Sequence, residues 1–208
     1  FLCKFMLAIL IWEWYPRLTN STEACSGGHF SLSGKVVFGK ERYIQRLGQN
    51  QGTNIENETH SWIELNAKSE HYLNISRKFS FGIKSEAVIS SKNFYNNYTS
   101  TIIQAPAFTP TPQSQTVFNE ALRANQFLAA GVIPIWKITN SFHFRTEFYG
   151  FAPIFEIKRG ENNKPYYGDL FRSFEYLGEV SLVYQLPFAS VSVYANKYSY
   201  PKDNWNFG

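Results

Sequence analysis

The feature that most constrains this chain is a regular alternation of apolar and polar side chains, which recurs between about residues 30 and 196. A period of two residues is typical of a β-strand, because successive side chains point to opposite faces of a sheet. The clearest example runs from His60 to Ile89, where a short connection at residues 74–77 separates two alternating stretches. This pattern predicts two antiparallel strands joined as a hairpin.

Further alternating stretches predict an all-β chain of about eight meandering antiparallel strands. They lie at residues 30–38, 142–148, 174–185 and 191–196. The expected strands of roughly 10 to 14 residues are longer than the globular norm of about 5 to 6. They match a tilted bilayer crossing of about 9 to 11 residues with extensions. Strand length therefore favours an antiparallel transmembrane β-barrel segment.

The connections between the expected strands alternate in length. Short ones fall at residues 74–77, 139–141 and 187–189, and long polar ones at 41–59, 91–121, 159–172 and 201–204. Short periplasmic turns and long extracellular loops are typical of outer-membrane barrels. We therefore expect the bacterial outer membrane as the location and its lipid as a partner.

The polar face of the expected strands carries charged residues in mid-strand. A dry core does not accept such groups unpaired, so they predict a wet, salt-bridged lumen. The residues of this expected network are Glu64, Lys68, Glu70, Lys84, Glu86, Arg145, Glu147, Glu175 and Glu179.

Aromatic residues near the strand ends predict girdles at the membrane–water interface. The candidates are Trp62, Tyr72, Trp136, Tyr184 and Trp205. Aromatic residues make up 18% of the chain and charged residues only 17%, against a usual charged share of about 25%. Rings in this number must be buried or face something other than water.

A helical membrane protein is excluded. The mean hydropathy is −0.29, and the longest uninterrupted apolar run, residues 5–12, is far shorter than the roughly 20 residues of a transmembrane helix. The two cysteines, Cys3 and Cys25, form no CxxC motif, so neither a metal site nor a disulfide framework is expected. The net charge of +4 comes from scattered Lys and Arg, which argues against a nucleic-acid partner. No cofactor is expected.

Several segments resemble a known family. They are SWIELNAKSEHYLNISRKFSFGIKSEAV, NYTSTIIQAPAFTPTPQS, FNEALRANQFLAAGVIPIWKI, SLVYQLPFASVSVYANKY and PKDNWNFG. They closely resemble the C-terminal barrel of Bacteroidetes patatin-like phospholipases. That barrel is similar to the surface-antigen barrel of outer-membrane assembly factors and two-partner secretion transporters. The resemblance covers residues 28–208, and residues 1–27 are expected to be a truncated strand and turn.

The resemblance implies a barrel of about sixteen strands, of which this chain holds part and is incomplete at both ends. It implies insertion by the barrel-assembly machinery and an upstream patatin-like domain in the same parent chain. In that superfamily a loop before a late strand folds into the lumen, where its Arg-Gly-Phe-like tip meets acidic residues. The matching stretch is 123–127, which keeps Arg123 and Phe127 without the glycine. A locking role for Arg123 is therefore implied, with a plain surface arginine as the alternative.

The residues for patatin-like hydrolysis are absent from the sequence. Such chemistry needs a GxSxG serine and an activating aspartate. No serine has this context, and the two aspartates, Asp169 and Asp203, are followed by Leu170 and Asn204. We therefore expect no enzyme activity in this chain and a catalytic domain upstream of it.

Three functions remain open at the level of sequence. The leading hypothesis is a barrel that anchors or surface-presents a patatin-like lipid acyl hydrolase. The alternative is a transport or assembly-factor-type barrel whose lumen is the functional path. The second alternative is a soluble secreted β-sandwich that serves as a binding module.

Overall fold

The computed structural model describes residues 8–14, 17–18, 27–47, 51–186, 189–200 and 205–208. Most of the expected N-terminal strand and turn, both cysteines and the expected loop 201–204 lie outside the described residues. The described part is mostly antiparallel β-sheet, which confirms the all-β prediction. No helix in it is long and apolar enough to cross a membrane.

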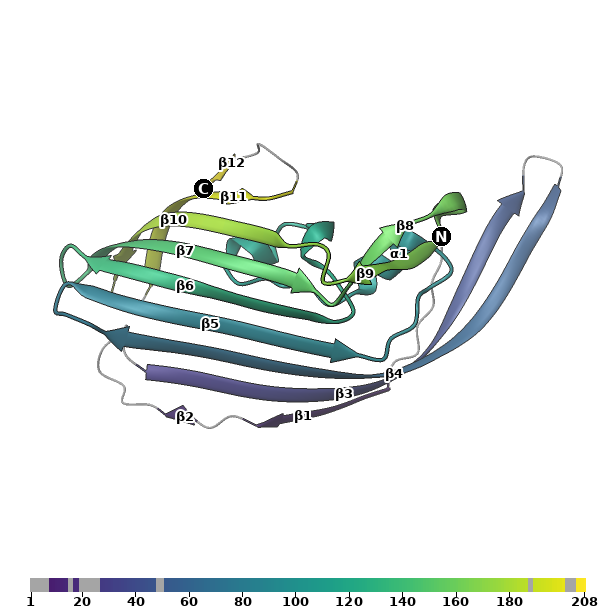
Figure 1. Cartoon of the computed structure of the whole chain (residues 1–208), viewed down its shortest axis with the longest axis horizontal. Helices are drawn as coiled ribbons and strands as arrows, with labels where there is room; N and C mark the ends of the chain where they lie inside the picture. Colours follow the sequence, from purple (N-terminus) through teal and green to yellow (C-terminus); the bar gives the residue numbers. More distant parts are fainter. Residues whose placement is uncertain (1–7, 15–16, 19–26, 48–50, 187–188, 201–204) are drawn as a thin grey trace.

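Ten described strands form one sheet (Figure 1). Its strands are β1 (Ala8–Trp14), β2 (Arg17–Leu18), β3 (Gly27–Leu47), β4 (Gln51–Asn74), β5 (Phe79–Ser90), β6 (Phe127–Lys137), β7 (Phe142–Pro153), β10 (Glu175–Gln185), β11 (Ser190–Tyr198) and β12 (Trp205–Phe207). The order across the sheet is β1-β3-β4-β5-β6-β7-β10-β11-β12, with β2 beside β3. Within the described part, β1 and β12 are opposite edges that do not pair with each other, so the sheet does not close.

Tight turns gather at one end of the sheet and long connections at the other, as Figure 1 shows. The turns follow β4 and β6, where only residues 75–78 and 138–141 separate neighbouring strands. The connection between β7 and β10 holds a separate hairpin of β8 (Phe155–Arg159) and β9 (Pro165–Leu170), joined by the short η3 helix (Glu161–Asn163). The expected open loop at 159–172 is therefore largely ordered as strand and helical turn.

The prediction of a loop at residues 41–59 is wrong. The β3 and β4 strands continue through most of it as a hairpin, which extends beyond the rest of the sheet in Figure 1. The pairing of β4 with β5 begins only at Glu64, so this part of the hairpin has no neighbouring strand on the β5 side. The apolar–polar alternation that marks a half-buried strand is missing from residues 41–59 of the sequence, so the pattern did not predict these strands.

The connection between β5 and β6 folds back over one face of the sheet, where an extended extracellular loop was expected. We call residues 91–126 the inner-face segment and the face that it covers the inner face. The segment contains α1 (Tyr98–Gln104), η1 (Gln113–Gln115) and η2 (Glu120–Leu122). The α1 helix begins where the Asn97 side chain accepts a hydrogen bond from the backbone N–H of Ser100 at 2.8 Å. It ends before Pro106, which cannot continue a helix.

The main hydrophobic core lies between the inner-face segment and the sheet. Phe108 is its central side chain, with ring centroids 6.3 Å from Phe127, 5.9 Å from Tyr149 and 6.1 Å from Phe151. Other core residues come from the segment and from β5, β6, β10 and β11, namely Val88, Leu122, Ala124, Ala129, Ile133, Ile135, Leu177 and Tyr198. The sheet therefore buries one part of its inner face against its own connection.

Candidate functional site

The two faces of the sheet reverse the usual distribution of buried and exposed side chains in a water-soluble sheet. On the inner face the Glu64 side chain is 6% exposed, while its neighbour Ile63 on the outer face is 55% exposed. The same holds on β7, where Glu147 is 2% and Phe148 is 58% exposed. A water-soluble sheet buries its apolar face and exposes its charges. Here apolar side chains cover the open face and carboxylates lie on the covered one.

Cross-strand ion pairs compensate the inner-face carboxylates. The register sets Lys35 opposite Glu64, Lys68 opposite Glu86 and Lys84 opposite Glu70. The corresponding N–O distances are 2.5, 3.1 and 3.6 Å, and Arg145 lies 2.6 Å from Glu147 within β7. Opposite charges that face each other across neighbouring strands stabilise a sheet. The structure thus brings seven of the nine expected lumen residues into these pairs: Glu64, Lys68, Glu70, Lys84, Glu86, Arg145 and Glu147.

Neutral donors complete the coordination of the carboxylates. Asn66 donates to Glu86 at 3.0 Å and Tyr72 donates to Glu70 at 2.6 Å. Tyr149 donates to Glu147, Ser199 donates to Glu175, and Asn196 donates to Glu179 at 3.3 Å. A buried carboxylate needs such partners because desolvation otherwise exceeds its Coulombic gain. The inner face therefore carries a series of paired polar groups on strands from β3 to β11.

The five expected interfacial aromatics divide between the faces. Trp136, Tyr184 and Trp205 are exposed. Trp62 is buried and Tyr72 packs against the main core, both on the inner face with Glu64 and Glu70. Their expected place in an outer girdle is corrected, because residues two positions apart on a strand share one face. Strand-end position alone does not fix the face.

Arg123 and Phe127 lie at the end of the inner-face segment. The Nη1 atom of Arg123 donates to the carbonyls of Ile103 at 2.8 Å and Ala105 at 3.1 Å, next to the end of α1. Among the described ion pairs none joins Arg123 to a carboxylate, so its observed partners are not the acidic residues that the resemblance implied. Phe127 is fully buried in the main core. Arg123 therefore joins two parts of the inner-face segment through hydrogen bonds, and Phe127 packs in the core next to the sheet.

Lys92 is a buried cation that sequence reasoning missed. Its Nζ atom donates to the carbonyl of Gln104 at 2.5 Å and lies 4.7 Å and 5.1 Å from the ring centroids of Trp62 and Tyr95. Burial is the largest influence on this ammonium group and lowers its pKa from 10.5 to about 8, although Glu64 acts in the opposite direction. A lysine that follows a strand gives no sequence signal of this kind, because the aromatic rings around it come from elsewhere in the chain.

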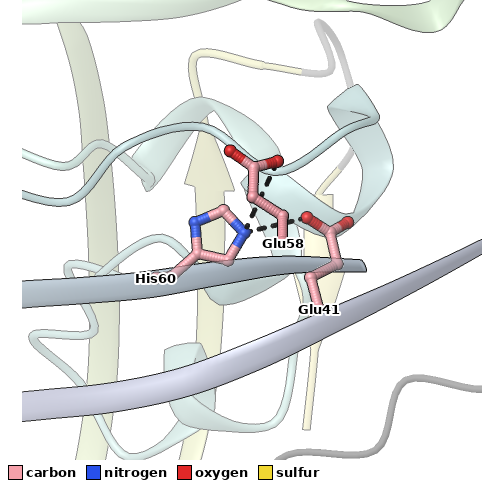
Figure 2. A group of neighbouring side chains, drawn as sticks. All are labelled: Glu41, Glu58 and His60. Carbon is pink, nitrogen blue, oxygen red and sulfur yellow. Dashed lines mark hydrogen bonds and ion pairs between the residues drawn. The ribbon is translucent and has the colours of Figure 1, made fainter. Parts of the chain in front are cut away.

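A second overlooked cluster lies on the extended β3–β4 hairpin. Figure 2 shows Glu41, Glu58 and His60 converging, with the Nε2 atom of His60 lying 3.0 Å from Glu41 and 4.0 Å from Glu58. Asn96 of the inner-face segment donates its backbone N–H to Glu41 at 3.2 Å. Glu41 lies 17 positions before Glu58 and 19 before His60, and it meets them only through the hairpin register. A prediction of strands in place of a loop at residues 41–59 would have set Glu41 opposite Glu58 and so indicated the cluster.

Comparisons with known proteins give no match to this chain. No protein-family model, no curated protein and no solved structure matches it. The two faces of the sheet and their contacts within the chain are the features that point to a function. The resemblance to patatin-like phospholipase barrels stays a prediction from sequence.

Proposed function

We propose that this chain is a transmembrane segment of a bacterial outer-membrane β-barrel. One observation carries the proposal: nearly buried, paired carboxylates alternate with exposed large apolar side chains on the same strands. Lipid is the solvent that favours an exposed apolar face, and a polar lumen accommodates ion pairs. The sorting of turns and long connections to opposite ends of the sheet supports the same function.

The proposed role of the barrel is to anchor or surface-present a patatin-like lipid acyl hydrolase located upstream in the parent chain. The family resemblance supports this part of the proposal. The proposed partners are outer-membrane lipid, the barrel-assembly machinery and that upstream domain. The inner-face segment favours anchoring over transport, since Phe108 and Lys84 fix it across the face that a transport path would need.

A soluble β-sandwich is the weaker alternative. In a sandwich two sheets bury their apolar faces against each other. In this chain Ile63, Leu65, Phe148 and Leu182 are exposed on the outer face. No second sheet covers that face within the described residues, whose only other sheet is the β8–β9 hairpin. The outer face is thus as apolar as a buried surface, but no part of the described chain covers it.

Quenching of tryptophan fluorescence by brominated lipid tests the proposal. The chain has five tryptophans, so two single-tryptophan variants are made, one keeping Trp136 and the other keeping Trp62. Trp136 is exposed and Trp62 is buried on the inner face. In vesicles with brominated acyl chains we expect strong quenching of Trp136 and little quenching of Trp62.

The two variants control for each other, because both carry the same number of substitutions. Equal and weak quenching of the two tryptophans would contradict the proposal. So would a complete parent protein that stays in the aqueous phase without detergent and fails to associate with vesicles.

A further inference from the structure

The extended β3–β4 hairpin places two carboxylates and an imidazole on one face. Glu41 and Glu58 are direct partners in the ladder, and His60 pairs with Gly39 two positions further along. Residues two positions apart share a face, so His60 lies on the same side as Glu58 and, across the ladder, as Glu41. Figure 2 shows the three side chains converging from the two strands. Their ligand atoms all lie within 4.8 Å of one another.

This arrangement is electrostatically costly without a cation. Like charges directly opposite each other destabilise an antiparallel pair. Burial raises the cost, since Glu41 is 1% and His60 5% exposed. Among the described ion pairs, His60 is the only basic residue paired with Glu41 or Glu58. A positive charge bound between the carboxylates would remove the repulsion.

The distances fit a tetrahedral metal ion. Zinc binds imidazole nitrogen and carboxylate oxygen at about 2.0–2.2 Å, so two ligands of one tetrahedral ion lie about 3.4 Å apart. The Nε2 atom of His60 lies 3.0 Å from the Oε2 atom of Glu41 and 4.0 Å from that of Glu58. These two separations lie on either side of the tetrahedral value. All three ligand atoms lie within 4.8 Å of one another, so rotation of the exposed Glu58 side chain would bring them around one ion.

Neighbouring groups already orient the three side chains. The backbone N–H of Asn96 lies 3.2 and 3.3 Å from the two oxygens of Glu41, and its side-chain amide lies 3.4 Å from Glu58. The ring of Tyr95 lies 4.7 Å from that of His60. Outer partners of this kind hold carboxylates and imidazoles in position in metal sites.

We propose that Glu41, Glu58 and His60 form a binding site for a divalent transition-metal ion of the Zn²⁺ type. Imidazole and carboxylate ligands suit this class of ion. Three protein ligands leave a fourth position for water on the side of Glu58, whose carboxylate is exposed. The bound ion would take the place of the His60–Glu41 hydrogen bond, with the imidazole neutral and its one proton on Nδ1. Through Asn96 the ion also fastens the start of the inner-face segment to the hairpin.

Titration of the full chain with Co²⁺ and with Zn²⁺ at pH 7.5 tests the site. Tetrahedral Co²⁺ has visible absorption bands, and calorimetry gives the Zn²⁺ affinity. We expect one ion per chain. Changing outer partners alone costs 10–100-fold in metal affinity, so loss of a ligand in Glu58→Gln should weaken binding on the order of 100-fold. Glu58 is exposed, so this variant is expected to keep the fold, which circular dichroism checks.

The matched control is Glu161→Gln, which removes one carboxylate from the β8–β9 hairpin and should leave the affinity unchanged. Thr59→Ala is a second control on the same hairpin, because its side chain points to the opposite face from Glu58 and His60. Equal affinities in Glu58→Gln and the controls, or an absence of tetrahedral Co²⁺ bands in the unsubstituted chain, would overturn the proposal. The site does not depend on whether lipid covers the outer face, so this test and the quenching test fail independently.

Discussion

At the residue scale, Lys92 holds an ammonium group inside the protein. It is 5% exposed, and two aromatic rings and one carbonyl oxygen surround its ammonium group. Burial disfavours the charged form, which is why its pKa is lowered to about 8. The lysine therefore changes charge within an experimentally accessible pH range.

We predict that raising the pH from 7.5 to 9.5 stabilises the unsubstituted chain relative to Lys92→Met. In the unfolded chain the lysine keeps its proton up to about pH 10.5, whereas in the folded chain it loses it near pH 8. The unfolded state then binds more protons between these values, so the free energy of unfolding rises with pH. The expected gain is about 1–2 kcal/mol.

The measurement is the free energy of unfolding of both proteins at the two pH values. The variant serves as the control for every other titrating group, since only the difference between the two proteins is used. A difference that stays constant, or that falls as the pH rises, would contradict the buried position of Lys92.

Residues that act across strands were the hardest to predict. The pairs Lys35–Glu64 and Lys68–Glu86 depend on the register, and the sequence analysis assigned Glu64, Lys68 and Glu86 to one face without pairing them. The cluster of Glu41, Glu58 and His60 was missed because residues 41–59 were expected to be a loop. Alternation fixes which face a side chain takes, while register fixes its neighbours.

At the scale of elements, the inner-face segment is the part that the sequence pattern did not predict. Phe108 has no periodic neighbours in the sequence, because residues around it form irregular turns. Its burial depends on long-range contacts with β6 and β7. The strands themselves were predictable, since alternation is a local property of each strand.

We predict that Phe108→Ala destabilises the chain by about 3–5 kcal/mol, the usual cost of removing a fully buried phenylalanine. The substitution removes the side chain that joins the inner-face segment to the rings of Phe127, Tyr149 and Phe151. Denaturant unfolding in detergent measures the effect.

The control is Phe118→Ala in the same segment, because the Phe118 ring is mostly exposed. It should cost less than about 1 kcal/mol. Similar losses in the two variants would show that the segment does not pack on the sheet through Phe108.

At the scale of the whole molecule, the proposed function depends on the contrast between an inner face with paired charges and an outer face with exposed apolar side chains. The sheet is open within the described residues. The sequence predicted an incomplete segment of a larger barrel, and that barrel belongs to the proposed function. A membrane protein would have lipid in contact with the outer-face side chains, and a soluble protein would have water there. A charge placed on that face distinguishes the two solvents.

We predict that Val180→Arg destabilises the chain in lipid vesicles by about 2–4 kcal/mol, the cost of arginine on a lipid-facing strand near the bilayer midplane. Val180 lies in the middle of β10 and is exposed on the outer face. In water the same change would stay within about 0.5 kcal/mol. The free energy of unfolding from vesicles is the quantity to measure.

Val191→Arg is the matched control. Val191 is exposed at the start of β11, next to the short connection at residues 186–189. Near the interface an arginine costs about 0–1 kcal/mol. Equal and small effects at the two positions would contradict a bilayer around the outer face.

The strand order described above also bears on how the sheet assembles. From β3 to β7 each strand pairs with the next one in the chain, and β10 to β12 repeat this order. Neighbouring strands joined by short connections have a small entropic cost of closure. Folding can therefore proceed hairpin by hairpin, with each completed strand serving as the template for the next. The rate-limiting step is then expected at the β5–β6 junction, where the inner-face segment (residues 91–126) intervenes and the two paired strands are farthest apart in sequence.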